Sequence, residues 1–172
     1  LGETLLYPQL VELVDHIRAR NGGVHIFIST NAQQANAPAI VDAIADKIDS
    51  LQLSIDGIGQ VFEEVRRNAA WDKYLANVRE IVRLTRGRRA RLKFNMVVLK
   101  ANYHQMADVV RLAEELGIPE IYFNTFNLVA NDWDTSHYGL YETAAFKQAL
   151  AEALGLARSK GILAGHDEIT WE

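Results

Sequence analysis

The segment that decides the fold class is residues 49–57, Asp49-Ser50-Leu51-Gln52-Leu53-Ser54-Ile55-Asp56-Gly57. Apolar and polar residues alternate strictly along this segment, which is the period of a β-strand with two different faces. Gly57 is typical of the point where such a strand ends. The segment therefore predicts a strand with an apolar face that packs on helices and a second face that carries Gln52, Ser54 and Asp56.

The same two-faced pattern occurs in three further segments, at 24–31, 92–99 and 120–126. A helix with apolar spacing is predicted before the first strand, at about 8–20, and helices follow the four strands at about 38–47, 71–86, 103–116 and 142–160. Residues 161–165 could open one more strand. Strands that alternate with helices of this length form a parallel sheet.

The fold class predicted from this order is α/β, with parallel strands that alternate with helices. A doubly wound sheet and a barrel both fit the order. A complete eightfold barrel takes about 250 residues, so 172 residues favour a partial TIM-like barrel. No Pro-, Gly- or Ser-rich linker interrupts the series, which predicts one domain over residues 1–172.

Composition narrows the range of partners. The chain is 49% hydrophobic and 23% charged, carries a formal charge of −4 and contains no cysteine. An acidic balance disfavours a nucleic-acid partner or an anionic membrane surface. No apolar run approaches the roughly 20 residues of a membrane span, and no segment has the pattern of a signal peptide. These features predict a cytoplasmic protein with a small-molecule partner.

Polar side chains gather near the carboxyl ends of all four predicted strands. Ligands of parallel α/β folds bind at those ends, and uncharged amides and hydroxyls suit ligand hydroxyls, amides and a heterocycle. The candidate ligand-binding residues from this pattern are Ser29, Asn31, Ser54, Asp56, Asn95 and Asn124. For each residue alone, satisfying loop backbone or capping the next helix is an equal alternative, and Asp56-Gly57 also fits a simple turn.

Other features are weaker. The five histidines lack metal-ligand spacing, so no metal site is predicted from them. The segment 127–141, with Trp133, His137 and Tyr138, is predicted to overhang the strand ends as a wall of the substrate site.

Several motifs occur in a characteristic order: Gly2-Glu3-Thr4-Leu5, Ser29-Thr30-Asn31, Leu53-Ser54-Ile55-Asp56-Gly57, and Asn95-Met96-Val97-Val98-Leu99-Lys100-Ala101-Asn102. Together they resemble the radical S-adenosylmethionine (SAM) superfamily. The segment 54–57, followed by Arg66, Arg67 and the stretch 71–75, resembles the branch that modifies peptides and proteins.

The resemblance implies a partial (β/α)6 barrel in which a [4Fe–4S] cluster binds SAM and splits it into methionine and a 5′-deoxyadenosyl radical that takes hydrogen from the substrate. The family's Gly-Gly-Glu-Pro motif, which holds the methionyl amino group, falls on residues 1–4, where Gly2 and Glu3 match. By the same analogy Ser54 and Asp56 would lie near the ribose hydroxyls and the carboxylate of SAM, and Asn95 would lie near SAM on the family's fifth strand. Residues 124–128, which begin with Asn124, would flank the adenine, and Ser29 and Asn31 would line the floor of the site.

The largest departure from the family is the absence of its Cys-x3-Cys-x2-Cys cluster motif, which precedes the Gly-Gly-Glu-Pro segment. The motif and the first strand are therefore expected upstream of Leu1, in an oxidoreductase of which these residues are a core fragment truncated at both ends. The fragment itself is expected to be inactive, with neither SAM nor cluster bound and no metal ligands. The alternatives are a non-catalytic α/β barrel scaffold or binding domain without a cluster, and a metal-independent hydrolase or aldolase that uses Lys93 or Lys100.

Overall fold

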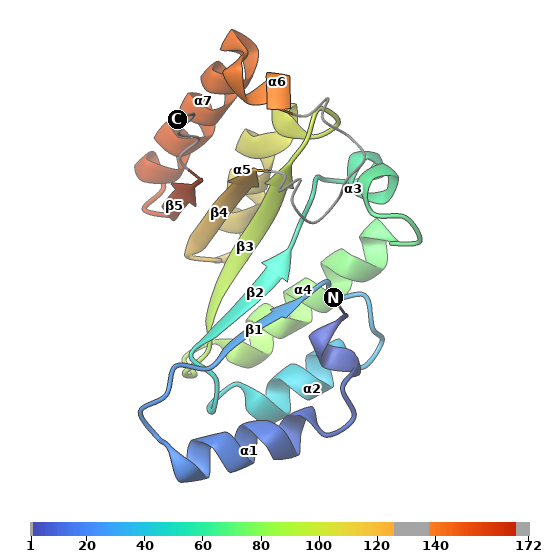
Figure 1. Cartoon of the computed structure of the whole chain (residues 1–172), viewed down its shortest axis with the longest axis vertical. Helices are drawn as coiled ribbons and strands as arrows, with labels where there is room; N and C mark the ends of the chain where they lie inside the picture. The colour runs from blue at the N-terminus through green and yellow to red at the C-terminus, as the bar shows by residue number, and fades with distance from the viewer. Residues whose placement is uncertain (1, 126–137, 168–172) are drawn as a thin grey trace. The chain divides into compact units, whose positions relative to one another are not determined.

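A computed structural model describes residues 2–125 and 138–167 of the chain (Figure 1). Five strands form one sheet in the order β1-β2-β3-β4-β5, in which β1 pairs with β2 and β4 pairs with β5 in parallel. The strands are β1 (Phe27–Thr30), β2 (Ser50–Ser54), β3 (Arg91–Val98), β4 (Glu120–Thr125) and β5 (Leu163–His166). The predicted α/β class, with parallel strands that alternate with helices, is confirmed.

Two of the helices precede β1, and the others lie between successive strands. The helices are η1 (Thr4–Leu6), α1 (Leu10–Arg20), α2 (Ala37–Ile44), α3 (Gln60–Val65), α4 (Trp71–Thr85), η2 (Tyr103–Gln105), α5 (Met106–Leu116), α6 (Tyr138–Glu142) and α7 (Ala144–Ser159). None of the helices in the described residues is long and apolar enough to cross a membrane.

The chain divides into two compact units, one made of residues 1–54 and 69–93 and the other of residues 55–68 and 94–172. In the first unit, β1 and β2 pair in parallel from Phe27↔Ser50 to Thr30↔Leu53. Ile28 on β1 and Leu51 and Leu53 on β2 are buried, as are Val41 of α2 and Val78 of α4. The apolar faces predicted from the alternation are therefore the faces that pack in this core.

Asp49, just before β2, bonds to residues near the amino-terminal end of β1. Its carboxylate accepts hydrogen bonds from the Ile26 amide at 2.8 Å and from the Arg18 guanidinium at 2.7 Å, and it also pairs with Arg89. Arg18 donates in addition to the carbonyls of Lys47 and Val24. The Ile26 amide and the Val24 carbonyl thus have side-chain partners in place of a neighbouring strand, and β1 begins at Phe27 and not at the predicted residue 24.

In the second unit, β4 and β5 pair in parallel from Glu120↔Leu163 to Phe123↔His166. Phe94 and Met96 on β3 and Ile121 and Phe123 on β4 form the buried sheet face, while α5 and α7 pack together. Gly165 leaves room for Tyr122, because a Cβ at this position would lie 2.8 Å from the tyrosine ring.

The carboxyl-terminal helical region differs from the single helix predicted at 142–160. Two helices occur, α6 and α7, because Thr143 caps the second of them: its hydroxyl accepts the Phe146 amide hydrogen bond at 3.2 Å. The strand predicted after residue 161 is β5, which begins at Leu163.

Candidate functional site

Glu3 organises the carboxyl end of β1 in the first unit. One carboxylate oxygen, Oε1, accepts hydrogen bonds from the Thr30 hydroxyl at 2.6 Å and from the Leu5 amide at 3.1 Å. The other oxygen, Oε2, accepts the amide of Asn31 at 2.8 Å. Glu3 thus fastens η1 to the end of β1, and its neighbour Gly2 is exposed.

The two candidate residues of β1 and its loop also have partners within the first unit. The Asn31 side-chain oxygen accepts the amide of Gln33 at 3.0 Å and the side chain of Gln34 at 3.2 Å. The Ser29 hydroxyl accepts the side-chain amide of Gln52 at 3.2 Å. Ser29 and Asn31 remain half-buried, so they are accessible in part.

Ser54 differs from these residues because its hydroxyl has no hydrogen-bond partner among residues 2–125 and 138–167. It is the last residue of β2 and is half-buried. A half-buried hydroxyl at a strand's carboxyl end is available to a ligand.

Asp56 lies in the second unit, where it is only 7% exposed. Its Oδ1 accepts the Val97 amide at 2.8 Å and its Oδ2 pairs with the Arg66 guanidinium at 2.8 Å. Burial raises the pKa of Asp56, and the Arg66 charge and the Val97 hydrogen bond oppose that rise. The Arg66 Nε atom is buried without a hydrogen-bond partner in the described structure.

The segment after Asp56 is held by two side chains. The buried amide of Asn102 donates to the Asp56 carbonyl at 3.1 Å and to the Val97 carbonyl at 2.9 Å. Gln105 accepts the Ile58 amide at 2.7 Å. Gly57 has a φ of +133°, and a Cβ there would lie 2.9 Å from Val61 Cγ1. The backbone at Gly57 thus favours glycine over other residues, and Asp56 before it is held in an ion pair with Arg66.

Asn95 and Asn124 meet across neighbouring strands of the second unit. The Asn124 side-chain amide donates to the Asn95 side-chain oxygen at 2.6 Å, which leaves the Asn95 NH₂ group as a donor and the Asn124 side-chain oxygen as an acceptor. Asn95 is 7% exposed and Asn124 is half-buried. The structure thus brings together two residues that the strand period had placed on equivalent faces.

The side chains of these residues bear on whether the chain could hold a metal cluster. No group of three His, Asp or Glu residues in the described ranges could hold a metal ion, and the 172 residues contain no cysteine. A [4Fe–4S] cluster held by three thiolates therefore does not fit the side chains of these residues. In the second unit, the side-chain amides of Asn95 and Asn124 can form hydrogen bonds of the kind that the hydroxyls and heterocycle of a nucleoside require. In the first unit, the Ser54 hydroxyl can do the same by itself.

Comparison with known proteins assigns the family. The sequence profile of the Radical SAM superfamily matches residues 1–128. The chain belongs to the radical SAM superfamily. The matched range contains all eight residues predicted to bind SAM. A comparison with curated protein sequences gives no match.

Radical SAM enzymes are also among the solved structures with a similar fold. Streptococcus suis SuiB bound to precursor peptide SuiA has a TM-score of 0.76 at 17% identity, over 97% of this chain and 37% of SuiB. A domain of pyruvate-formate lyase-activating enzyme from Bacteroides vulgatus has a TM-score of 0.66 at 12% identity, over 98% of this chain and 96% of that domain. TYW1 with a lysine-pyruvate adduct bound has a TM-score of 0.61 at 19% identity, over 91% of this chain and 47% of TYW1. The chain thus spans little more than a third of SuiB and has the partial-barrel fold of radical SAM proteins.

Two residues that hold Asp56 in place, Arg66 and Asn102, are not among the residues predicted to form the site. In the sequence, Arg66 is one residue of a charged segment and Asn102 ends a motif. A polar residue a few positions after a predicted strand, as Asn102 is, is a signal that could have indicated its role. Of the predicted substrate wall at 127–141, residues 127–137 with Trp133 and His137 lie outside the described residues, as does the side chain of Tyr138. Residues 138–141 belong to α6.

Proposed function

We propose that these 172 residues are part of a radical SAM enzyme that reductively cleaves SAM and takes hydrogen from a peptidyl substrate. The observation that carries the proposal is the family match over residues 1–128, because it includes the polar residues at the carboxyl ends of β1 to β4. When bound in such enzymes, the [4Fe–4S] cluster supplies the electron that splits SAM. We propose that its cysteine ligands belong to a part of the enzyme beyond this sequence.

The residues of this chain would bind and orient SAM. In the first unit, Glu3 would hold the strand end and Ser54 would offer its free hydroxyl, with Gly2, Ser29 and Asn31 alongside. In the second unit, the donor and acceptor of the Asn95–Asn124 pair would hydrogen-bond to the nucleoside. Each carboxylate oxygen of Asp56 already has one partner, but a carboxylate can accept further hydrogen bonds. Asp56 would therefore hold Arg66 in place and contact the ligand as well.

A peptidyl substrate is supported by SuiB, which was solved with its precursor peptide SuiA, and with SAM. The peptide and SAM are ligands of SuiB, and at 17% identity the similarity to this chain shows a shared fold alone. The segment 54–57 followed by Arg66 and Arg67 adds the resemblance to enzymes that modify peptides.

The test is 5′-deoxyadenosine formation by the complete enzyme, purified without oxygen, reconstituted with iron and sulfide, and given SAM and a strong reductant. We expect product above a control without cluster, and about a tenfold loss in SAM affinity for Asn95→Ala, from one or two lost hydrogen bonds. Gln148→Ala, at an exposed position on α7, is the matched control. An enzyme that binds no iron would favour the non-catalytic scaffold instead.

The isolated 172-residue chain offers a second readout. Without cluster ligands it should form no 5′-deoxyadenosine and bind SAM at most weakly, which isothermal titration calorimetry measures. Tight SAM binding by this chain alone would contradict the expectation that the cluster supplies most of the affinity.

A further inference from the structure

Two hollows lie next to each other between α7 and β5, both within the second unit. The first has a volume of about 510 Å³ and is lined by residues of α6 and α7 and by the end of β5. The second, of about 390 Å³, is lined by residues of α7, of β5 and of the turn between them. His166 lines both. We call the two hollows together the α7–β5 groove, defined by Phe146, Lys147, Leu150, Leu154, Arg158 and His166.

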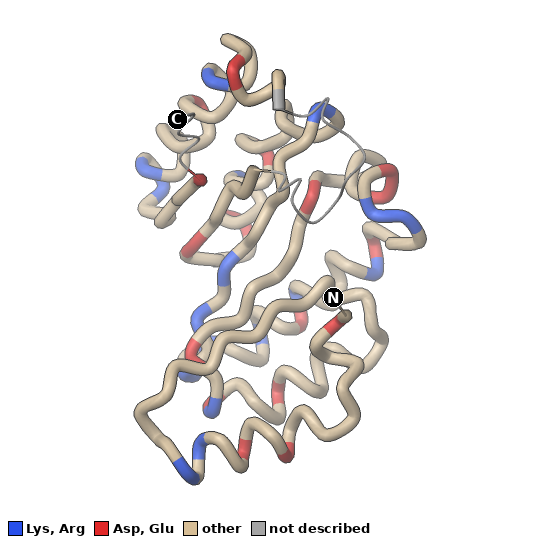
Figure 2. Tube along the Cα trace, in the orientation of Figure 1, with Lys and Arg blue, Asp and Glu red and all other residues tan. Residues whose placement is uncertain are grey.

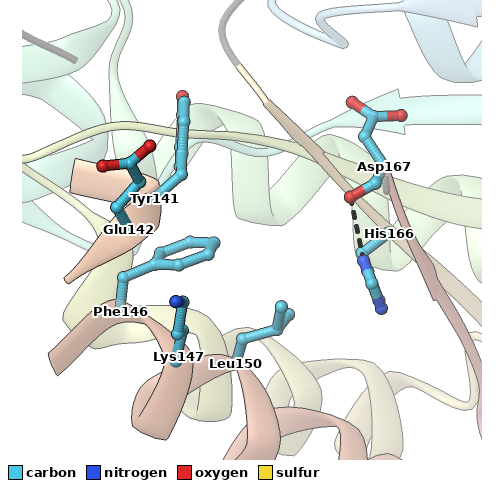
Figure 3. A pocket seen from close by; sticks show the side chains of 7 residues that line it. All are labelled: Tyr141, Glu142, Phe146, Lys147, Leu150, His166 and Asp167. Carbon is cyan, nitrogen blue, oxygen red and sulfur yellow. Dashed lines mark hydrogen bonds between the residues drawn. The ribbon is translucent and has the colours of Figure 1, made fainter. Parts of the chain in front are cut away.

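The floor of the groove is apolar. Phe146 packs edge-on against Tyr141 with ring centroids 5.2 Å apart, and Leu150 and Leu154 continue the apolar surface along α7. Figure 3 shows Phe146 and Leu150 on one side of the first hollow and His166 and Asp167 on the other. Leu163, which lines the second hollow, is 68% exposed and extends this apolar surface.

The rim of the groove is basic. Lys147 and Arg158 lie 11 residues apart on α7, so they share a helix face about 16 Å apart, and both are exposed. Neither has an ion pair within the described part of the chain. Figure 2 shows Lys and Arg near both ends of α7. Two carboxylates line the first hollow: Glu142, which is exposed, and Asp167, which accepts hydrogen bonds from Tyr122 and Thr125.

The edge of β5 adds a backbone surface. The amides of Leu163 and Asp167 donate to carbonyls of the β4 segment, and alternate residues of a parallel strand face the same neighbour. The N–H and C=O groups of Ala164 and His166 therefore point away from β4. The strand order ends at β5, and β4 is its only strand partner within the described ranges.

We propose that the α7–β5 groove binds an extended acidic peptide segment that pairs with the free edge of β5. Its apolar side chains would occupy the two hollows, and carboxylates four to six residues apart would reach Lys147 and Arg158, since a strand advances about 3.3 Å per residue. Strand addition of this kind takes affinity from the main chain and specificity from pockets beneath alternate side chains. This inference extends the proposed function by giving a peptidyl substrate a docking surface distant in sequence from the SAM-binding residues.

The test uses the 172-residue chain and the synthetic peptide acetyl-Glu-Ser-Val-Ser-Val-Ser-Glu-amide, with binding followed by fluorescence anisotropy. The control peptide carries Lys in place of both Glu residues. We expect the acidic peptide to bind about tenfold more tightly, the size expected of two exposed ion pairs. The double variant Lys147→Glu, Arg158→Glu should invert the preference, whereas Arg20→Glu, at an exposed position on α1, should leave it unchanged.

A third peptide, N-methylated at alternate residues, tests the edge pairing without altering the protein. It should lose most of the affinity, because methylation removes the donors that pair with β5. Equal binding of the acidic and basic peptides, or full affinity after N-methylation, would overturn the proposal. So would a chain that dimerises in analytical ultracentrifugation and dissociates on Lys147→Glu, Arg158→Glu, because the groove would then hold a second copy. The assay contains neither SAM nor cluster, so its failure leaves the proposed radical chemistry untouched.

Discussion

The side-chain amide of Asn102 donates to the main-chain carbonyl of Asp56 at 3.1 Å. The same amide group donates to the Val97 carbonyl, and the Asn102 oxygen accepts the Leu99 amide at 2.7 Å. Asn102 is fully buried, so three backbone groups of the second unit depend on one side chain. The position of Asp56 is therefore set from the segment that follows β3.

Asn102→Ala should lower the free energy of unfolding by about 2–4 kcal/mol, because it leaves buried backbone groups without partners. Urea denaturation followed by circular dichroism measures the change. Gln148→Ala, at an exposed position, should change stability by less than about 0.5 kcal/mol. A loss for Asn102→Ala no larger than this control would show that water replaces the side chain.

Most of what could be predicted from the sequence follows from the alternation of apolar and polar side chains along the strands. It placed Asn95 and Asn124 on equivalent faces of two strands, and the structure joins them by a hydrogen bond of 2.6 Å. It also separated the buried Leu51 and Leu53 from the half-buried Ser54. A period of two residues is a local property, so one sequence is enough to find it.

Contacts outside that period were not predictable. Arg66 reaches Asp56 from the end of α3, after a segment with two glycines of positive φ, and no local pattern gives the path of such a segment. The late start of β1 depends on Asp49 and Arg18, which lie 31 residues apart in sequence. Both features depend on ion pairs between residues that are not neighbours in the sequence, which form only in the folded chain.

Gly57→Ala should destabilise the chain by about 2–4 kcal/mol, since it adds backbone strain and a steric clash. The φ of +133° is rarely adopted by alanine, and the new Cβ would lie 2.9 Å from Val61 and 3.1 Å from the Phe62 amide nitrogen. Thermal unfolding measures the effect. Gly155→Ala is the matched control, because its Cβ meets nothing within 4 Å and alanine favours a helix by about 0.5–1 kcal/mol. The two substitutions should shift the melting temperature in opposite directions, and a shift in the same direction would contradict the strain at Gly57.

Acidification should weaken the first unit through Asp49. The hydrogen bond from the Ile26 amide and the Arg18 and Arg89 guanidinium groups hold the pKa of Asp49 far below its ordinary value of 3.8. A lowered carboxyl pKa contributes stability above the unfolded-state value, and that contribution is lost as pH falls below it. Asp49→Asn should cost about 2 kcal/mol near neutral pH and flatten the fall in stability below about pH 4.

Chemical denaturation at a series of pH values from 7 to 3 tests this expectation. Glu64→Gln, at an exposed position on α3, should retain the pH dependence of the wild-type chain. If Asp49→Asn lost stability with acid as steeply as the wild type, another carboxylate would be responsible.

Arg66→Gln should raise the pKa of Asp56 further. Burial already raises that pKa, and the Arg66 charge 2.8 Å away is the largest opposing influence, so its removal leaves the desolvated carboxylate with only the Val97 hydrogen bond. Because a raised carboxyl pKa gives stability that is lost as pH rises through it, Arg66→Gln should be less stable relative to the wild type at pH 7 than at pH 4. Carbon-13 NMR titration of the Asp56 carboxyl measures the pKa directly. Arg67→Gln, the exposed neighbour, should leave it unchanged, and an Asp56 pKa that fell or stayed constant in Arg66→Gln would show that the ion pair does not persist in solution.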